Sequence, residues 1–324
     1  MQGASAAYAE VISEGNSFSD RSDLILRVID AHVHTWTHDM LSEKDIEARR
    51  IAASKAGIPP QLDAPISKLK EAMKSAGIER AVILPIDSGL NQKMPLSLRE
   101  KTNWHADEIR GDKSLITFVG LDPRRGEEGL AELERAVKDK GCRGLKMYPP
   151  NGFYPDEKRF YPYYKLCTDL NIPVVIHQGF TSRFKHVKYA RPVYVDKVAA
   201  DFPDLKIVLA HVGIPWVDEA LMVSSKNPNV SVDVSGWQAA ASTVPMKVYQ
   251  MVADAKFVRV FPNRMLWASD FPLFEYAMPI GEWVRFFSKM RLPSTLIDLG
   301  YSQITDSELD LCMWKNASHI FFGE

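Results

Sequence analysis

Eight short apolar segments recur along the 324-residue chain, with helix-like segments between them. Each is rich in Val, Ile or Leu, has a length typical of a buried strand, and closes on Gly, Pro or a polar residue. Alternating strands and helices require parallel strands with right-handed crossovers. Eight such units predict an α/β protein with a distorted (β/α)8 TIM barrel. The predicted strands span residues 26–34, 80–86, 115–123, 143–150, 172–179, 205–213, 229–237 and 264–272.

The segments between the strands have the spacing of amphipathic helices. Residues 65–78 place Ile66, Leu69 and Met73 on one face and end at Gly77, a residue typical of a helix C-terminus. Two further helical segments span residues 126–141 and 191–203.

An open doubly wound sheet is the alternative fold, but the Gly-rich turn usual after its first strand is replaced by "HVHTWTHDM".

The barrel carries two expected loop insertions. Residues 36–64 follow the first predicted strand, and residues 180–192 follow the fifth. We expect residues 1–25 to form a mobile leader and residues 26–324 to form a single barrel domain, because no long linker or repeat interrupts the pattern.

Charge and cysteine content exclude several classes of protein. The chain has 40 Lys and Arg against 41 Asp and Glu, so no net field favours nucleic acid or an acidic membrane. Its three cysteines are far apart and form no CxxC motif, which favours free thiols in a reducing compartment. No secretory signal and no membrane-spanning apolar run is evident. We therefore expect a cytoplasmic protein that binds neither nucleic acid nor membranes.

The first predicted strand ends in the stretch "VIDAHVHTW", residues 28–36. Side chains alternate along a strand, so His32 and His34 are expected to point into the barrel together with Asp30. The same alternation predicts that Ile29 and Ala31 face the helices. The two histidines lie at the carboxyl end of the strand, where the active sites of TIM barrels are found.

Three more strands end in a polar residue. His177 ends the fifth, His211 the sixth, and Asp270 the eighth. One strand-end histidine is more often an ordinary hydrogen-bonded polar group, but five such groups at one rim are typical of a Zn²⁺ site or a similar divalent site. An open coordination position would make this site catalytic. We assign no role to His38, His105 or His319.

Lys146 lies in "GLKMYPP" and shares a strand face with Gly144 and Tyr148, so it can point into the barrel. Two interpretations stay open. The lysine is carboxylated and bridges two metals, or pairs with a substrate anion. Alternatively, it only contributes polarity to the barrel interior or extends toward the rim.

The order HxH, His, His, Asp on strands one, five, six and eight resembles the amidohydrolase superfamily. More narrowly, it resembles the amidohydrolase-related branch that includes aminocarboxymuconate-semialdehyde decarboxylase. The segments "DAHVHTW", "DFPDLKIVLAHVGIPW", "ASDFPL" and "KNASHIFFG" stand in the order of that branch. The resemblance also suggests a homodimer.

The resemblance implies roles for individual residues. It implies one divalent metal, with zinc expected before Mn, Fe or Co. His211 would lie beside the metal water or bind a second metal together with Lys146. The Lys146 segment is similar to that of binuclear, dihydroorotase-like members, whereas the decarboxylases generally lack this lysine as a ligand. The implied ligands of the first metal are His32, His34, His177 and Asp270.

Such a shell favours hydrolysis. A bound divalent ion lowers the pKa of its water from 15.7 to about 7. Asp270 would take the proton, and His211 would orient the water or stabilise the oxyanion. The alternative is non-oxidative decarboxylation with Asp270 or His211 as the proton donor, because fold and shell do not fix the reaction. A non-catalytic barrel would be expected to lack a ligand, and the set is complete.

The substrate is expected to be a small carboxylated or aromatic ester, lactone or amide. Arg183 lies in a basic, aromatic loop after the fifth strand, which is either a carboxylate clamp or a solvated surface loop. Trp36 and Trp216 each follow a strand-end histidine and are candidates for the walls of the pocket, or for caps on the barrel mouth.

Overall fold

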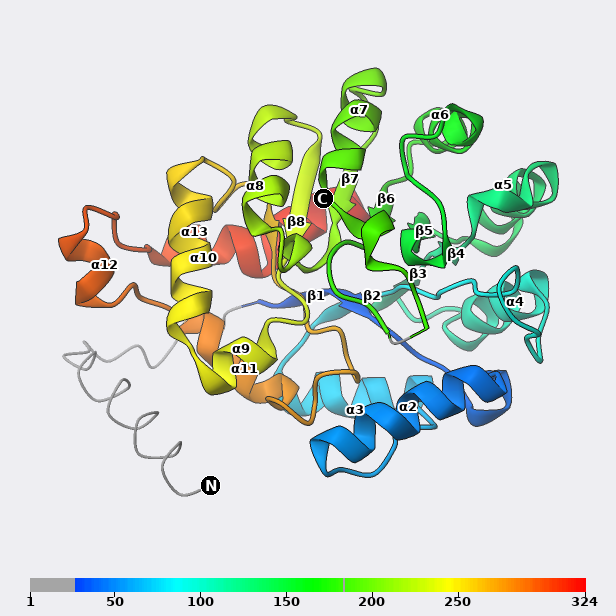
Figure 1. Ribbon diagram of the computed structural model, residues 1–324, viewed down its shortest axis with the longest axis horizontal. Coiled ribbons are helices and arrows are strands. Elements are labelled where there is room, and N and C mark those ends of the chain that lie inside the picture. The colour runs from blue at the N-terminus through cyan, green and yellow to red at the C-terminus, as the bar shows by residue number, and fades with distance from the viewer. Residues whose placement is uncertain (1–26, 183) are drawn as a thin grey trace.

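The computed structural model describes residues 27–182 and 184–324. The expected leader, residues 1–25, lies outside the described residues. Figure 1 shows short strands gathered at the centre of the molecule and helices arranged around them. The fold is a (β/α)8 barrel, which confirms the fold class that the sequence predicts.

Each predicted strand has a counterpart in the barrel, and the third is divided by Phe118 into two short pieces. Among the described residues the strands are β1 (Ile29–Val33), β2 (Arg80–Ile83), β3 (Leu115–Thr117), β4 (Val119–Gly120), β5 (Leu145–Met147), β6 (Val174–Ile176), β7 (Ile207–Leu209), β8 (Val230–Asp233) and β9 (Met265–Leu266).

The strands pair in parallel in the orders β1-β2-β3 and β4-β5-β6-β7-β8-β9. The two sheets are joined at Phe118, whose N–H donates to the Ile83 carbonyl at 3.0 Å. The barrel closes between β1 and β9. There the Ala31 N–H donates to the Trp267 carbonyl at 3.2 Å, and Val33 forms a parallel bridge with Phe271.

Helices cover the outside of the strands (Figure 1). The helix predicted over residues 65–78 is α3, and it ends at Gly77 as expected. Gly77 adopts a left-handed conformation with φ of +70°. Among the described residues the helices are α2 (Glu43–Ala56), α3 (Ile66–Ala76), α4 (Leu98–Glu108), α5 (Glu127–Lys140), α6 (Tyr161–Asp169), α7 (Val193–Asp201), α8 (Val217–Lys226), α9 (Gln238–Thr243), α10 (Met246–Phe257), α11 (Ile280–Ser288), α12 (Ser294–Asp298) and α13 (Asp306–Asp310).

Short helical turns lie between these elements. Segment 36–64 holds the turn η1 and helix α2, which begins with a capping box between Ser42 and Asp45. Segment 180–192 holds the turn η5. The turns are η1 (His38–Met40), η2 (Pro123–Arg125), η3 (Pro149–Asn151), η4 (Lys158–Phe160), η5 (Val187–Ala190) and η6 (Ala210–Gly213). Two π-helical segments, η7 (Leu311–Lys315) and η8 (Ser318–Phe322), continue the chain after α13.

The side chains of β1 depart from simple alternation. Its register against β2 shifts between Asp30 and Val33. Ile29 and Ala31 pack in one cluster with apolar residues of β2, β6, β7 and β9, which form the inner layer of the barrel. The prediction that these two residues face the helices is therefore wrong. A register irregularity allows neighbouring residues to face the same side, so His32 also points inward.

Candidate metal centre

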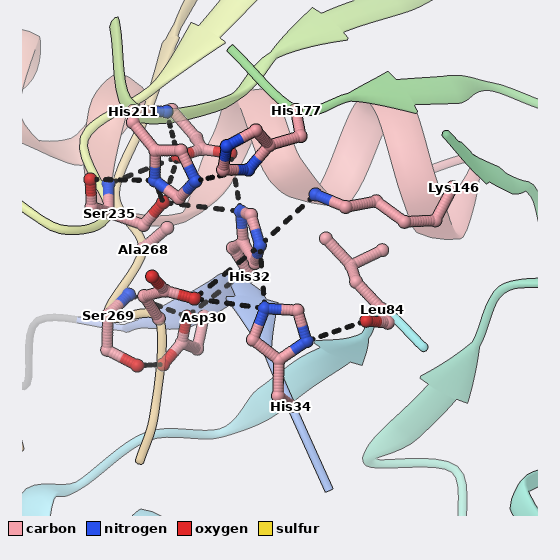
Figure 2. Close-up of polar contacts among 12 residues, drawn as sticks. Asp30, His32, His34, Leu84, Lys146, His177, His211, Ser235, Ala268 and Ser269 are labelled. Carbon is pink, nitrogen blue, oxygen red and sulfur yellow. Dashed lines mark hydrogen bonds and ion pairs between the residues drawn. The ribbon is translucent and has the colours of Figure 1, made fainter. Parts of the chain in front are cut away.

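The strand ends bring polar side chains to one place inside the barrel mouth (Figure 2). Residues in β1, β5 and β8, or just after them, meet there with residues that follow β6, β7 and β9 within four positions. All of them are at least nine-tenths buried. This group, called here the polar centre, consists of His32, His34, Lys146, His177, His211, Asp233, Ser235 and Asp270.

Three atoms of the polar centre converge. His34 Nε2 lies 3.3 Å from His32 Nε2 and 3.0 Å from Asp270 Oδ1, and His32 Nε2 lies 3.7 Å from the same oxygen. These three residues form one of the two groups whose geometry could hold a metal ion among the described residues.

Hydrogen bonds on the far side of each ring show which nitrogen carries the proton. His34 Nδ1 lies 2.7 Å from the Leu84 carbonyl, which can only accept a hydrogen bond. His32 Nδ1 lies 2.9 Å from the carboxylate of Asp233. In the neutral rings both Nδ1 atoms are therefore protonated, and both Nε2 atoms direct lone pairs at the carboxylate oxygen of Asp270.

This arrangement fits a divalent cation. Three electron-rich atoms face one another, and the buried Asp270 Oδ1 has no hydrogen-bond donor. Lys146 Nζ reaches only His32 Nε2, at 3.3 Å, so a shared cation or an additional proton on His34 is needed to balance Asp270 Oδ1. Ligand atoms about 2.0–2.2 Å from one ion lie roughly 3.0–3.6 Å apart, which is close to the separations of the three atoms.

Burial keeps the imidazoles of His32, His177 and His211 in their neutral, ligand-competent form. Burial, assisted by the charge of Lys146, lowers the pKa of His32 to about 3. Burial also lowers the pKa of His177 and of His211. Burial alone would raise the pKa of Asp270, but the imidazoles of His34 and His32 outweigh it and hold that pKa below its usual value.

His177 lies beside His211 and not within the convergent group. Its Nδ1 is 3.1 Å from His211 Nε2, and its Nε2 is 2.8 Å from the Phe180 carbonyl. The expected metal ligand is therefore at the same rim, but both of its nitrogens have protein partners. Coordination by His177 would require its ring to exchange one of these contacts for the ion.

His211 and Asp270 share an unusual backbone conformation. Both are non-glycine residues with positive φ, +62° for His211 and +56° for Asp270. Such left-handed residues cost free energy and persist where surrounding contacts hold them, often at functional sites. The Asp270 N–H donates to the His32 carbonyl at 2.9 Å, which ties the carboxylate-bearing residue directly to β1.

Lys146 points into the barrel, the direction that its place on the strand predicts. Figure 2 shows its chain extending toward His32, and its Nζ lies 3.3 Å from His32 Nε2. Burial lowers its pKa from 10.5 to about 8, although Asp233 and Asp270 favour the ammonium form. The amine thus stands beside the convergent group without belonging to it.

Sequence reasoning assigned no site role to Asp233, Ser235 or Asp30. Asp233 contacts the ring of His32 and the backbone N–H of His211, and Ser235 contacts both rings. Their signal was present in "NVSVDVSGW", where a carboxylate and a hydroxyl alternate with valines at a strand end. Asp30 accepts hydrogen bonds from the backbone and hydroxyl of Ser269. Burial raises the pKa of Asp30 to about 7.

The expected substrate-binding residues have different surroundings. Trp36 is buried, and the guanidinium of Arg49 lies 3.8 Å from the centre of its ring. Trp216 is half-buried beside Arg191, at 5.7 Å from its ring centre. Arg183 lies outside the described residues.

The chain belongs to the amidohydrolase family, because the family model described as Amidohydrolase matches residues 29–323. It is therefore an enzyme of the amidohydrolase superfamily. A dihydroorotase from Vibrio vulnificus is 24% identical over 168 residues, which cover 48% of this chain and 47% of the relative. A dihydroorotase from Aliivibrio salmonicida is 26% identical over 221 residues, covering 65% and 56%. The chain thus spans about half the length of the curated relatives it matches.

Solved structures share the fold over nearly the whole chain. A 5-carboxyvanillate decarboxylase from Novosphingobium aromaticivorans, complexed with manganese and a nitrobenzoic acid, has a TM-score of 0.64 at 15% identity and covers 91% of this chain and 96% of its own. An amidohydrolase from Burkholderia multivorans with bound zinc scores 0.63 at 16% identity, covering 91% and 98%. A probable 2-pyrone-4,6-dicarboxylic acid hydrolase from Acinetobacter baumannii scores 0.60 at 14%, covering 92% and 100%. At these identities the likeness shows the fold alone.

Within the part of the chain that the structure describes, every helix is too short or too polar to cross a membrane.

Proposed function

We propose that this enzyme is a metal-dependent hydrolase that cleaves an ester, lactone or amide of a small carboxylated or aromatic molecule. The observation that carries the proposal is the convergence of His32, His34 and Asp270, whose buried Oδ1 lacks a hydrogen-bond donor. We propose zinc as the resident ion, with manganese as the alternative, because His and Asp shells accept both.

The divalent ion, when bound, supplies a Lewis acid and lowers the pKa of water that it contacts. The protein's own residues provide the other functions. Asp270 is ionised and stands beside the ligand imidazoles, so it can accept a proton from the attacking water and return it to the leaving group. His211 is neutral and adjacent, and its Nδ1 faces the Ser235 carbonyl, so its Nε2 can accept a hydrogen bond from the attacking water and orient it.

An aromatic wall near this group supports a planar substrate. The ring of Phe180 lies 5.4 Å from that of His211 and 5.7 Å from that of Phe274. The wall continues to Tyr276, whose ring stacks on Phe274 at 6.2 Å. Phe180 and Tyr276 retain exposed surface, which leaves them able to pack against a bound ring.

Three cations near the mouth support a carboxylate on that substrate. Arg49, Lys101 and Lys185 are only partly exposed, and none of them forms an ion pair with a carboxylate in the described residues. Burial lowers the pKa of each, to about 10 for Arg49. Asp45 acts on all three from beyond ion-pair distance, so an incoming anion in direct contact would stabilise them further.

We expect Lys185→Gln to raise KM for a carboxylated substrate by about tenfold with a smaller change in kcat, because one charged hydrogen bond is lost in ground and transition states alike. The Lys185 ammonium is already held near the mouth by Asn151 Oδ1 at 2.5 Å. Lys188→Gln on the same loop is the control, since Lys188 is exposed and contacts the ring of Tyr189. Equal KM values in both variants and the wild type would exclude this lysine from substrate binding.

Decarboxylation is the second candidate. The manganese-containing decarboxylase with the same fold supports this candidate. The three cations without an ion pair would suit a benzoate-like acid as well as a carboxylated ester, lactone or amide. In this case Asp270 or His211 would first take up a proton from water and then deliver it to the ring carbon as CO2 leaves.

The two functions can be distinguished by incorporation of ¹⁸O from water and by release of CO2. Metal-replete protein is incubated in ¹⁸O-water with esters, lactones and amides of hydroxybenzoic acids, and with the free acids. Hydrolysis predicts ¹⁸O in the product carboxylate, loss of turnover on dialysis against a chelator, and recovery on adding zinc. Release of CO2 from the free acids would instead establish the decarboxylase, and full activity after metal removal would contradict both.

A further inference from the structure

Asp233, at the end of β8, contacts three residues of the polar centre through its two carboxylate oxygens. Its Oδ2 accepts the Nδ1–H of His32 at 2.9 Å. Its Oδ1 accepts the backbone N–H of His211 at 3.0 Å, the backbone N–H of Ser235 at 3.1 Å, and the hydroxyl of Ser235. The carboxylate is fully buried, and both of its oxygens act only as acceptors.

The hydrogen bond between Asp233 and His32 determines which ring nitrogen of His32 carries the proton, and therefore whether Nε2 can bind an ion. With the proton on Nδ1, the Nε2 lone pair points toward His34 and Asp270. In the opposite tautomer, an N–H would occupy that direction, and His32 could not act as a ligand. A carboxylate behind a metal-binding histidine fixes the tautomer and raises the basicity of the ligand.

We propose that Asp233 is a positioning residue that holds His32 in its metal-binding tautomer and so sets the affinity of the site for the ion. This inference rests on the proposed metal-dependent function. The same carboxylate also holds the backbone of His211 in its left-handed conformation, because the His211 N–H has Asp233 Oδ1 as its acceptor. One buried charge therefore positions a ligand on β1 and a candidate catalytic group after β7.

A different role for Asp233 is conceivable on geometry alone. His32, His211 and Asp233 form a second group that could hold a metal ion. Direct coordination would have to displace the proton shared by His32 and Asp233 and compete with the three donors on Oδ1. The existing bonds favour positioning over coordination, and the number of ions per chain distinguishes the two.

The test uses Asp233→Asn in the full-length protein. An amide has one acceptor oxygen, so it cannot serve both His32 and the three donors on the other side. Turning its NH2 toward His32 Nδ1 forces the proton onto Nε2. We expect the dissociation constant for zinc, measured by competition with a chromogenic chelator, to rise about 10–100-fold, the usual effect of losing such a partner.

Asp30→Asn is the matched control, because Asp30 is equally buried and lies on the same strand as His32. Its Oδ1 accepts two backbone N–H groups, from His32 and Ser269, and its Oδ2 faces the Ser269 hydroxyl. An asparagine can keep the first two bonds through its oxygen and donate to the hydroxyl through its NH2. We expect its zinc affinity to match that of the wild type.

A second measurement needs no variant. Long-range ¹H–¹⁵N correlation spectra of metal-free wild-type protein report the tautomer of His32, which we expect to be protonated on Nδ1. Protonation on Nε2 would overturn the inference, as would unchanged zinc affinity in folded Asp233→Asn, or two ions in the wild type of which that variant loses one. A wild type that binds neither zinc nor manganese would contradict the proposed function, and the spectra would still decide the role of Asp233.

Discussion

Asp270→Ala is expected to lower the affinity for zinc by more than about 100-fold, beyond the 10–100-fold typical of losing an outer partner of a ligand. The reason is the orphaned Oδ1, which contributes the only negative charge among the three convergent atoms. Without it, two neutral imidazoles remain to hold the ion. Elemental analysis after dialysis, together with chelator competition, measures the loss.

Asp270→Asn, measured in the same way, separates the contribution of the carboxylate charge to zinc affinity from that of an oxygen at this position. It keeps an oxygen at the same position, so zinc should bind more tightly than in Asp270→Ala and more weakly than in the wild type. Turnover should fall in both variants, because an amide cannot accept the proton that we assign to Asp270. One tightly held ion per chain in Asp270→Ala would show that the carboxylate is not a ligand.

Lys146→Met is expected to stabilise the metal-free protein at neutral pH by up to roughly 3 kcal/mol, the free energy that corresponds to the lowered pKa. Burial holds the pKa of Lys146 at about 8 in the folded protein, against 10.5 in the unfolded chain. Methionine fills similar space without a charge. Urea denaturation in the presence of a chelator gives the difference in unfolding free energy.

The pH dependence of this difference has a defined sign. Between about 8 and 10.5 the unfolded chain binds the Lys146 proton and the folded protein has released it, so the stability of the wild type rises with pH. The advantage of Lys146→Met should be largest below pH 8 and vanish as the pH approaches 10.5. Lys138→Met, at an exposed i,i+4 pair with Glu134 on α5, is the control and should change little. Destabilisation by Lys146→Met at neutral pH would mean that the ammonium holds Asp233 and Asp270 together.

Much of the barrel and its rim could be predicted because both follow from local periodicity. Short apolar runs that end in a polar residue locate strands whatever their partners are, so His32, His34 and Asp270 were found before their separations were known. The inward direction of Lys146 followed from the same alternation. These predictions needed no knowledge of how one strand lies against another.

The remaining features depend on contacts between strands. The register shift in β1 arises from its pairing with β2, so the sequence of β1 alone placed Ile29 and Ala31 on the wrong side. The ring of His177 is directed by the Phe180 carbonyl and by His211, neither of which a strand pattern locates. Asp233 carried the same signal as the histidines, but its importance appears only when its three partners are assembled around it.

The closure of the barrel between β1 and β9 links formation of the site to folding. His32 and His34 stand near one end of the chain and Asp270 near the other, and they meet only when the first and last strands join. An ion bound by all three would link β1 to the segment after β9, and it would bind the closed barrel far more tightly than an open one. Because this contact joins residues separated by about three quarters of the chain, its loop-closure cost is high and it is expected to form late. Newly made chains would thus acquire their metal as the last step of maturation.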